Sequence, residues 1–387
     1  MKTLYVVLLT SLICLSCASQ NRKSSHHKSV EIYSSRLGKE IKHIVDKHAK
    51  KALEDSLINS LSIGLYVYNV SLSFNYGALT QGGKDTPTNK TIYEIASVTK
   101  TFTGTLAAKA VLEGKLRLED DIRRYLPKRY PNLEYKGKPI RIKHLLTHTS
   151  GLPSGILGMD QKEFSKDLSE IEFNQRYTEF EKLQTKSTFF RELSKLKITQ
   201  EPGTKFEYSN PGSNLMGYIL EVVYNMEFQQ LVMDKIVRKI QMEDTHFNTS
   251  DDSKNRLAKG YLLQNEMPET PLAKTLWGAE GAMKSTVSDM LKYMHYHLGN
   301  NEVVKESHRR LYEIDTDYWI GYFWWNIQNQ NHDLHYRHDG GISRAKSRLI
   351  LYPKQKIGII LFANQSSVRI NQRLDDLIYG IYNELTE

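Results

Sequence analysis

Strand-like segments stand at both ends of this chain, and helical patterns fill its middle. Two short segments rich in β-branched and aromatic residues, Ser62–Val70 and Leu72–Ala78, lie close enough together for a hairpin. Four more strands are predicted towards the other end, at Tyr318–Gln328, Leu334–His338, Ser347–Tyr352 and Ile357–Ala363. This order predicts an α+β fold, in which the two ends of the chain build one antiparallel sheet with helices on its faces.

The helical patterns complete this outline. Apolar residues recur at helical spacing between Tyr33 and Ser60, and Val368–Leu385 has the pattern of a closing helix. Its apolar side is formed by Leu374, Leu377, Ile378 and Ile381. The middle has three helical patterns, Leu106–Leu118, Phe164–Leu196 and Leu215–Met233. We therefore expect one domain at residues 33–387, with residues 33–90 and about 275–387 forming the sheet and about 91–274 forming an inserted helical subdomain.

The N-terminal segment predicts export. Lys2 precedes the apolar run Leu4–Leu15, which has about the length of a signal-peptide core and is too short to span a bilayer. The stretch Leu15-Ser16-Cys17-Ala18-Ser19 resembles a bacterial lipoprotein cleavage site, although Cys14 stands where an aliphatic residue is usual. We expect residues 1–16 to be removed, Cys17 to be acylated and residues 17–32 to form a flexible tether at the cell envelope. An ordinary secretory signal and a retained anchor are the alternatives.

The other composition data exclude some function classes. The only two cysteines, Cys14 and Cys17, lie in the signal segment, so the mature domain has no disulfide and no cysteine nucleophile. The net charge is +9, but its 53 Lys and Arg residues are scattered among 44 Asp and Glu residues. No basic stripe with interleaved aromatic residues is present, so nucleic acid is not an expected partner.

A serine and a lysine stand three positions apart in the stretch Thr91–Thr103, TIYEIASVTKTFT. Positions i and i+3 share one face of a helix, so Lys100 lies beside Ser97, and the free N–H groups of the first turn favour negative charge. A neutral lysine could then activate the serine as a nucleophile. The alternative is an ordinary helix N-cap, because serine is a preferred capping residue.

A loop between two Pro/Gly turns, in the stretch Glu201–Gly212, presents Tyr208 and Asn210 on either side of a serine. Near Lys100, Tyr208 could exist partly as a phenolate and serve as general base towards Ser97 and general acid towards a leaving group. Asn210 could hold the lysine ammonium and a substrate carbonyl. A turn with a packed tyrosine is the alternative.

The stretch Tyr336–Ser343 predicts a strand that carries His338 into the paired glycines Gly340 and Gly341. Glycine lets a substrate backbone approach closely, and a free N–H after His338 could form an oxyanion hole with the N–H of Ser97.

A metal site is the competing hypothesis, because His332, His335 and His338 are spaced by threes. Side chains alternate along a strand, so His335 would point away from the other two. We expect no metal or other cofactor, and we expect His332 and His335 to be surface residues.

These motifs, in this order, resemble those of the serine β-lactamase and penicillin-binding-protein-like hydrolases, especially the branch with class C β-lactamases, D,D-peptidases, D-aminopeptidases and esterases. Two further stretches, Leu145–Pro153 and Gly278–Met290, also resemble family segments, so the match covers nearly the whole mature chain. The resemblance implies Ser97 as acylated nucleophile and Lys100 with Tyr208 as the proton-transfer pair. It also implies Asn210 and His338 in substrate orientation, and the backbone of Gly341 with that of Ser97 as oxyanion hole.

His338 departs from the family pattern, which often has lysine there, and Asp339 follows it. A histidine is mostly neutral near its reference pKa of about 6.5, so recognition of a substrate carboxylate is in doubt unless another cation supplies it. The expected function is an exported serine hydrolase acting on a small ester, amide or peptide, like the family's esterases and D-aminopeptidases. A D,D-peptidase or weak β-lactamase acting on cell-wall peptides, and a non-catalytic binding protein on the same fold, are the alternatives.

Overall fold

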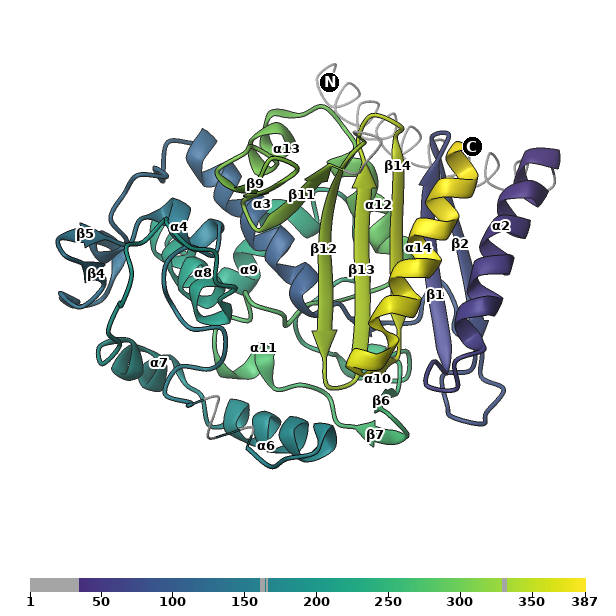
Figure 1. Cartoon of the computed structure of the whole chain (residues 1–387), viewed down its shortest axis with the longest axis horizontal. Coiled ribbons are helices and arrows are strands. Elements are labelled where there is room, and N and C mark those ends of the chain that lie inside the picture. Colours follow the sequence, from purple (N-terminus) through teal and green to yellow (C-terminus); the bar gives the residue numbers. More distant parts are fainter. Residues whose placement is uncertain (1–34, 161–163, 165, 329–332) are drawn as a thin grey trace, which may run out of the picture.

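An eight-stranded antiparallel sheet forms the centre of the computed structural model, which describes residues 35–160, 164, 166–328 and 333–387 (Figure 1). The strand order is β2-β1-β14-β13-β12-β11-β10-β9. In that order the strands are Val70–Gly77, Ser60–Val67, Ile357–Ala363, Ala345–Tyr352, Leu334–Ile342, Trp324–Gln328, Tyr318–Gly321 and Tyr312–Asp315. Strands β1 and β14 pair directly, with Ile63 opposite Leu361. The predicted sheet built from the two ends of the chain is confirmed.

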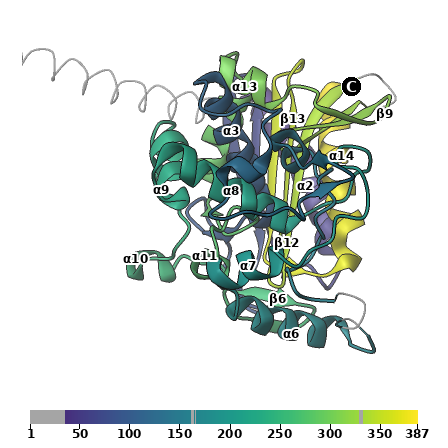
Figure 2. The same cartoon turned by 90° about the vertical axis from the view of Figure 1, so that its left-hand side faces the viewer.

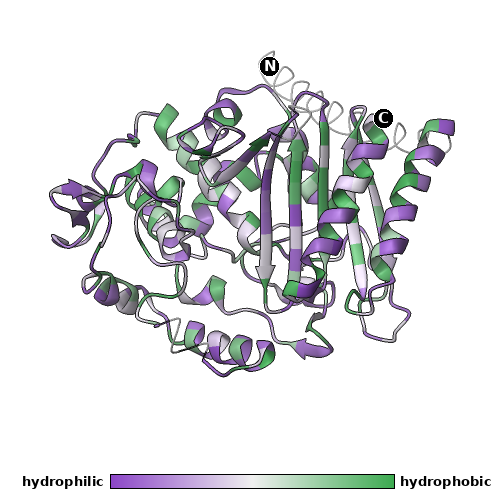
Figure 3. Ribbon diagram, in the orientation of Figure 1, coloured by the Kyte–Doolittle hydropathy of each residue, from purple (hydrophilic) through white to green (hydrophobic). Residues whose placement is uncertain are grey.

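Two helices cover one face of the sheet, α2 (Arg36–Leu53) and α14 (Asn371–Thr386). The four apolar residues predicted for the closing helix are all buried in this layer. Figure 2 shows these helices on one side of the sheet and α3 (Thr99–Leu112) on the other. Figure 3 shows the green and purple residues of α2 and α14, which mark an apolar side and a polar side. Side chains of the strands alternate between the two cores, so Ile359 and Leu361 pack under α14 while Ile360 and Phe362 face the other way.

Helices dominate the middle of the chain, as predicted. They include α4 (Ile142–Leu146), α6 (Glu170–Lys182), α7 (Lys186–Leu193), α8 (Asn210–Tyr224), α9 (Phe228–Val232), α10 (Asp251–Lys254) and α11 (Leu272–Thr275). Two more helices, α12 (Val287–His297) and α13 (Glu302–Ser307), follow before the last strands. Short strands form three further small sheets. These sheets are β3 (Tyr93–Glu94) with β8 (Lys284–Ser285), β4 (Glu134–Tyr135) with β5 (Lys138–Pro139), and β6 (Gly260–Leu262) between β7 (Asn265–Met267) and β15 (Gln365–Ser366).

Several predicted boundaries were wrong. The pattern at Phe164–Leu196 contains two helices, α6 and α7. The first ends at Lys182, and the hydroxyl of Thr185 caps the start of the second. The pattern at Leu215–Met233 also breaks, at Asn225, which adopts a left-handed conformation after α8.

The predicted single strand Tyr318–Gln328 is a hairpin. Tyr322 and Phe323 form its turn with φ of 50° and 69°, although bulky residues rarely adopt positive φ. Tertiary contacts stabilise this turn, because the N–H of Phe323 donates to the carbonyl of Leu146 (2.8 Å) and Gly104 leaves room for the carbonyl of Tyr322. Both turn residues are buried, so packing outweighs local preference here.

The predicted signal segment, the tether and Cys17 lie outside the described residues. Within the described residues, no helix is both long and apolar enough to cross a membrane.

Candidate active site

Ser97 lies in a short 3₁₀ turn, Ala96–Val98, immediately before α3. Ala96 adopts a positive φ of 49°, which lets the chain turn sharply between β3 and the helix. The N-cap position of α3 is Val98, and no side chain caps it. The hydroxyl of Ser97 is therefore not a helix cap, and its half-buried side chain contacts Lys100 instead.

Lys100 reaches back one helical turn towards Ser97. Its ammonium nitrogen Nζ lies 3.1 Å from Ser97 Oγ, 2.8 Å from Asn210 Oδ1 and 2.5 Å from the backbone carbonyl of Glu280. These partners come from the 3₁₀ turn before α3, from the first residue of α8 and from the loop before β8. The predicted contacts of Lys100 with Ser97 and Asn210 are both present.

Burial changes the acid–base properties of Lys100. The side chain has no exposed surface, and desolvation lowers its pKa from 10.5 to about 7, although the negative charge of Glu280 acts in the opposite direction. A large fraction of this lysine is therefore neutral at physiological pH. A neutral amine 3.1 Å from a serine hydroxyl can accept its proton.

Tyr208 lies on the loop that also carries Asn210. Its ring centroid is 4.9 Å from Lys100 Nζ and 4.4 Å from the ring of His148. The backbone N–H groups of Glu207 and Ser209 donate to the carbonyl and the Nδ1 of His148, at 2.7 and 3.1 Å. The segment around His148 therefore holds the Tyr208 loop at both ends.

The protonation state of Tyr208 differs from the phenolate of the sequence-based hypothesis. Burial raises the pKa of its phenol above 10, and the negative charges of Glu280 and Asp339 add to the rise, while a hydrogen bond with Ser97 opposes it. Tyr208 is therefore a protonated phenol at neutral pH. In this state it can donate a proton and cannot accept one from Ser97.

His338 lies in β12 and is completely buried. Its ring stacks on Trp325 at 5.2 Å, and its Nδ1 lies 2.8 Å from the carbonyl of Asp339. Desolvation lowers its pKa to about 3, and the charge of Lys100 acts in the same direction. The expectation that His338 is neutral agrees with this environment.

The two glycines that follow have different surroundings. A Cβ on Gly340 would lie 2.4 Å from the carbonyl oxygen of Ile95 and 3.1 Å from the Cβ of Ala96, so this glycine lets β12 approach the turn before Ser97. Gly341 is exposed, and a Cβ there would first meet the flexible side chain of Lys346, with Nζ at 3.0 Å. We predicted that a substrate backbone approaches these glycines. At Gly340, it is instead the protein's own Ile95–Ala96 segment that lies close.

One edge of β12 is open beside these glycines. The pairing of β11 with β12 ends at Trp325 opposite Arg337. From His338 to Ile342, β12 pairs with β13 on one edge, and no described strand pairs with the other. An extended substrate could form backbone hydrogen bonds along this edge.

Asp339 and His335 point to the opposite face of the sheet from His338. Asp339 accepts two hydrogen bonds from the guanidinium of Arg337, at 2.6 and 2.8 Å, on the face opposite His338. His335 packs against Tyr352 and Tyr379 and is only 2% exposed, so the prediction of a surface residue was wrong. An antiparallel strand covered on both faces buries histidines on either side.

His335 and His338 point to opposite faces of the sheet, as predicted. His332 lies outside the described residues. In the part of the chain that the structure describes, no group of three His, Cys, Asp or Glu side chains is suited to a metal ion.

Several site residues were not predicted from the sequence. The carbonyl of Glu280 binds Lys100, and His148 holds the Tyr208 loop. Both belong to stretches that the family resemblance singled out, so that signal was available. Tyr177 and Glu181 of α6 also lie close to the site, since a hydrogen bond with Asn210 affects Tyr177 and the charge of Glu280 affects both. Nothing in the local pattern of α6 indicates this placement.

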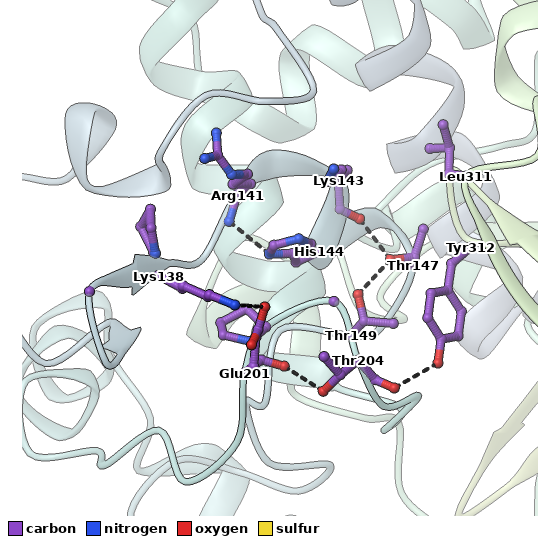
Figure 4. Close-up of a pocket in the computed structure, with 14 residues that line it drawn as sticks. Lys138, Arg141, Lys143, His144, Thr147, Thr149, Glu201, Thr204, Leu311 and Tyr312 are labelled. Carbon is purple, nitrogen blue, oxygen red and sulfur yellow. Dashed lines mark hydrogen bonds and ion pairs between the residues drawn. The ribbon is translucent and has the colours of Figure 1, made fainter.

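A cavity of about 510 Å³ lies elsewhere, between α4 and the Glu201–Thr204 turn (Figure 4). Its basic side chains are paired, because Lys138 binds Glu201 at 2.6 Å and Lys143 binds Glu119 at 2.7 Å. None of Ser97, Lys100 or Tyr208 lines it. We assign no function to this cavity.

An antiparallel sheet between helices, with a serine and a buried lysine at the start of a central helix, defines the class of serine β-lactamase-like hydrolases. The family model described as Beta-lactamase matches residues 45–379, and the chain belongs to this family of serine β-lactamase and penicillin-binding-protein-like proteins.

Similar proteins agree with this membership. The chain is 28% identical to Protein flp of Staphylococcus aureus (strain N315) over 363 residues, which are 90% of this chain and 68% of that protein. It is 23% identical to a Beta-lactamase of Providencia stuartii over 365 residues, covering 83% of this chain and 86% of that one.

Two solved structures share the fold. A Beta-lactamase/D-alanine Carboxypeptidase from Yersinia pestis, complexed with citrate, superimposes with a TM-score of 0.75 at 22% identity, covering 90% of this chain and 99% of that one. Its counterpart from Pseudomonas syringae gives a TM-score of 0.74 at 20% identity, covering 89% and 98%. At these identities the likeness shows the α+β fold alone.

Proposed function

We propose that this protein is a serine hydrolase that forms an acyl-enzyme on Ser97 with a small ester, amide or peptide substrate. One observation carries the proposal, namely that a buried lysine with a pKa of about 7 lies 3.1 Å from a serine hydroxyl that caps no helix. A binding protein without catalytic activity has no need for this pair, because burying the lysine costs stability.

In the proposed acylation step, neutral Lys100 takes the proton of Ser97 while Oγ attacks the substrate carbonyl carbon. The N–H groups of Ser97 and Gly341 stabilise the oxyanion. The leaving group departs when the carbonyl re-forms, and it takes a proton from the phenol of Tyr208, which Lys100 then reprotonates. Water hydrolyses the acyl-enzyme by the same transfers in reverse, so no net proton is gained or lost.

The raised pKa of Tyr208 supports this assignment of roles. The phenol stays protonated and so holds a proton for the leaving group, whereas a lysine with a pKa near the working pH can accept the proton of Ser97. Asn210 orients the lysine through its 2.8 Å contact.

The substrate class is proposed from His338. A buried neutral imidazole provides no fixed positive charge for a carboxylate, which favours uncharged esters, amides and peptides of the esterase or D-aminopeptidase type. Activity as a D,D-peptidase or weak β-lactamase is the second candidate. The likeness of the fold to two proteins described as Beta-lactamase/D-alanine Carboxypeptidase favours this candidate.

We also propose that the protein is exported and anchored at the cell envelope by acylation of Cys17. The lipoprotein-like stretch around Cys17 supports this proposal. Mass spectrometry of the N-terminal peptide from membranes tests it, and a peptide cut elsewhere and carrying no lipid would contradict it.

A fluorophosphonate probe tests the central proposal. Wild-type protein should be labelled covalently on Ser97, and Ser97→Ala should abolish both labelling and ester hydrolysis. The substitution should leave the circular dichroism unchanged, because the hydroxyl supports no helix cap. Labelling that persists in a folded Ser97→Ala protein would remove Ser97 from the mechanism.

A further inference from the structure

The side chain of Lys346 lies over Gly341 at the open edge of β12. Lys346 stands opposite Gly341 in the register of β12 and β13. A Cβ on Gly341 would lie 3.0 Å from Lys346 Nζ and 3.4 Å from its Cδ. Gly341 does not adopt a positive φ, so its backbone conformation does not require glycine. The missing side chain instead leaves the space that the lysine occupies.

The backbone of Gly341 points to this open edge. Ile342 and Ala345 close the hairpin of β12 and β13 around a two-residue turn, so these two residues exchange both of their backbone hydrogen bonds. Gly341 and Lys346 therefore form the next, non-hydrogen-bonded pair, in which the N–H of Gly341 points away from β13 and the side chains approach closely. This N–H is the one that the proposed function assigns to the oxyanion hole.

The charge of Lys346 has no direct partner among the described residues. Desolvation of the half-buried side chain and the charge of Arg348 lower its pKa, whereas Glu170 and Asp339 oppose the fall through their charges alone, without a hydrogen bond. Arg348 is itself paired, with Asp375 at 2.9 Å. A poorly hydrated ammonium acts more strongly on nearby charge than one in water does.

The two nearby carboxylates are held by other groups. Asp339 binds the guanidinium of Arg337 at 2.6 Å. Glu170 accepts a hydrogen bond from the backbone N–H of Val368 at 3.3 Å. Neither carboxylate therefore neutralises Lys346, and its positive charge remains available at the open edge of β12.

We propose that Lys346 supports the oxyanion hole, because its ammonium lies beside the backbone of Gly341 and stabilises the negative charge that develops there in the transition state. This inference rests on the proposed function, since it adds a supporting residue to the same reaction. The ammonium acts through the field at Gly341 and exchanges no proton with the substrate. An uncharged ester has no such negative charge before it reacts, so Lys346 should affect its reaction rather than its binding.

The test compares Lys346→Met, which removes the charge, with Lys346→Arg, which keeps it. For p-nitrophenyl butyrate, Lys346→Met should lower kcat/KM about 10-fold, which is less than the loss of about 100- to 1000-fold for a direct oxyanion-hole donor. Lys346→Arg should stay within about 3-fold of the wild type. Lys354→Met is the matched control, because Lys354 is exposed in the turn after the other end of β13, and its kcat/KM should equal that of the wild type.

Phenylboronic acid separates an effect on the oxyanion from a loss of packing. Ser97 Oγ adds to its boron atom and the hydroxyl proton passes to Lys100, so the adduct is a tetrahedral anion that resembles the transition state. Lys346→Met should raise the inhibition constant about 10-fold, and Lys346→Arg should restore it. Benzyl alcohol, an uncharged ligand of similar size that forms no adduct, should inhibit the wild type and all variants equally.

Three results would overturn the inference. The first is an unchanged kcat/KM and inhibition constant in a folded Lys346→Met protein. The second is a loss confined to an anionic ester such as mono-p-nitrophenyl adipate, because Lys346 would then bind a substrate carboxylate. The third is an equal loss in Lys346→Met and Lys346→Arg, which would show that the shape of the side chain matters rather than its charge.

The proposed function is tested separately by the same proteins. Ester hydrolysis and fluorophosphonate labelling of the wild type leave it standing whatever the Lys346 variants do. Absence of both in the wild type would instead overturn the proposed function, and the inference with it.

Discussion

The proposed acid–base role of Lys100 can be tested by replacing one neighbouring amide group with a carboxylate. Asn210 Oδ1 lies 2.8 Å from Lys100 Nζ, so Asn210→Asp replaces a neutral acceptor by a carboxylate of the same shape. An opposite charge at this distance favours the ammonium form and raises the pKa of a lysine by about one to three units. We therefore expect the pKa of Lys100 to rise from about 7 to about 8–10.

The expected loss of activity follows from the fraction of neutral lysine. At pH 7 that fraction is about one half when the pKa is about 7. It falls to between about one tenth and one thousandth for a pKa of about 8–10. Acylation by Asn210→Asp should slow by the corresponding factor at pH 7 and recover as the pH rises, because only the neutral amine accepts the serine proton.

The assay is kcat/KM for an uncharged p-nitrophenyl ester between pH 5.5 and 10, corrected for spontaneous hydrolysis. The wild type should rise with a midpoint near pH 7, and the variant with a midpoint near pH 8–10. The histidines of the site cannot cause this rise in kcat/KM near pH 7, because burial holds the pKa of His338 at about 3 and that of His148 well below 6.5.

Asn210→Ala is the control, because it removes the acceptor without adding charge. Its plateau should fall through poorer orientation of Lys100, and its midpoint should stay near pH 7 or move slightly lower. If the midpoint of Asn210→Asp also stays near 7, the titrating base is not Lys100 and the proposed proton transfer is refuted.

Three further outcomes are expected. Lys100→Met should be inactive, yet below pH 7 its free energy of unfolding in urea should exceed that of the wild type by up to about 5 kcal/mol, because the folded protein lowers the pKa of Lys100 from 10.5 to about 7. This gain should vanish as the pH rises from 7 towards 10.5, and a constant or negative difference would contradict the lowered pKa. His338→Lys should shift kcat/KM about 10- to 100-fold towards a chromogenic cephalosporin relative to the ester, and no shift would show that a cation at this position does not select carboxylates. Gly340→Ala should lower both melting temperature and activity, because its Cβ meets the Ile95 carbonyl, whereas Gly341→Ala should leave the melting temperature nearly unchanged; equal losses would contradict the assigned contacts.

The sequence by itself determined the elements whose signal is local. Short segments rich in β-branched and aromatic residues gave β1 and β14. The helical spacing of apolar residues gave the buried side of α14, because that spacing reports which side of a helix is buried. The spacing of Ser97 and Lys100 placed the two side chains together, since one helical turn fixes that distance whatever surrounds it.

Only the tertiary structure decided the chemistry around that pair. The lysine's other two contacts come from Asn210 and Glu280, which are 110 and 180 positions away in the chain. The phenol of Tyr208 stays protonated for a similar reason, since its pKa depends on burial and on charges from distant segments. Periodicity shows which side chains are buried but not which polar groups accompany them. A desolvated group responds to all charges near it, so its protonation state depends on the assembled fold.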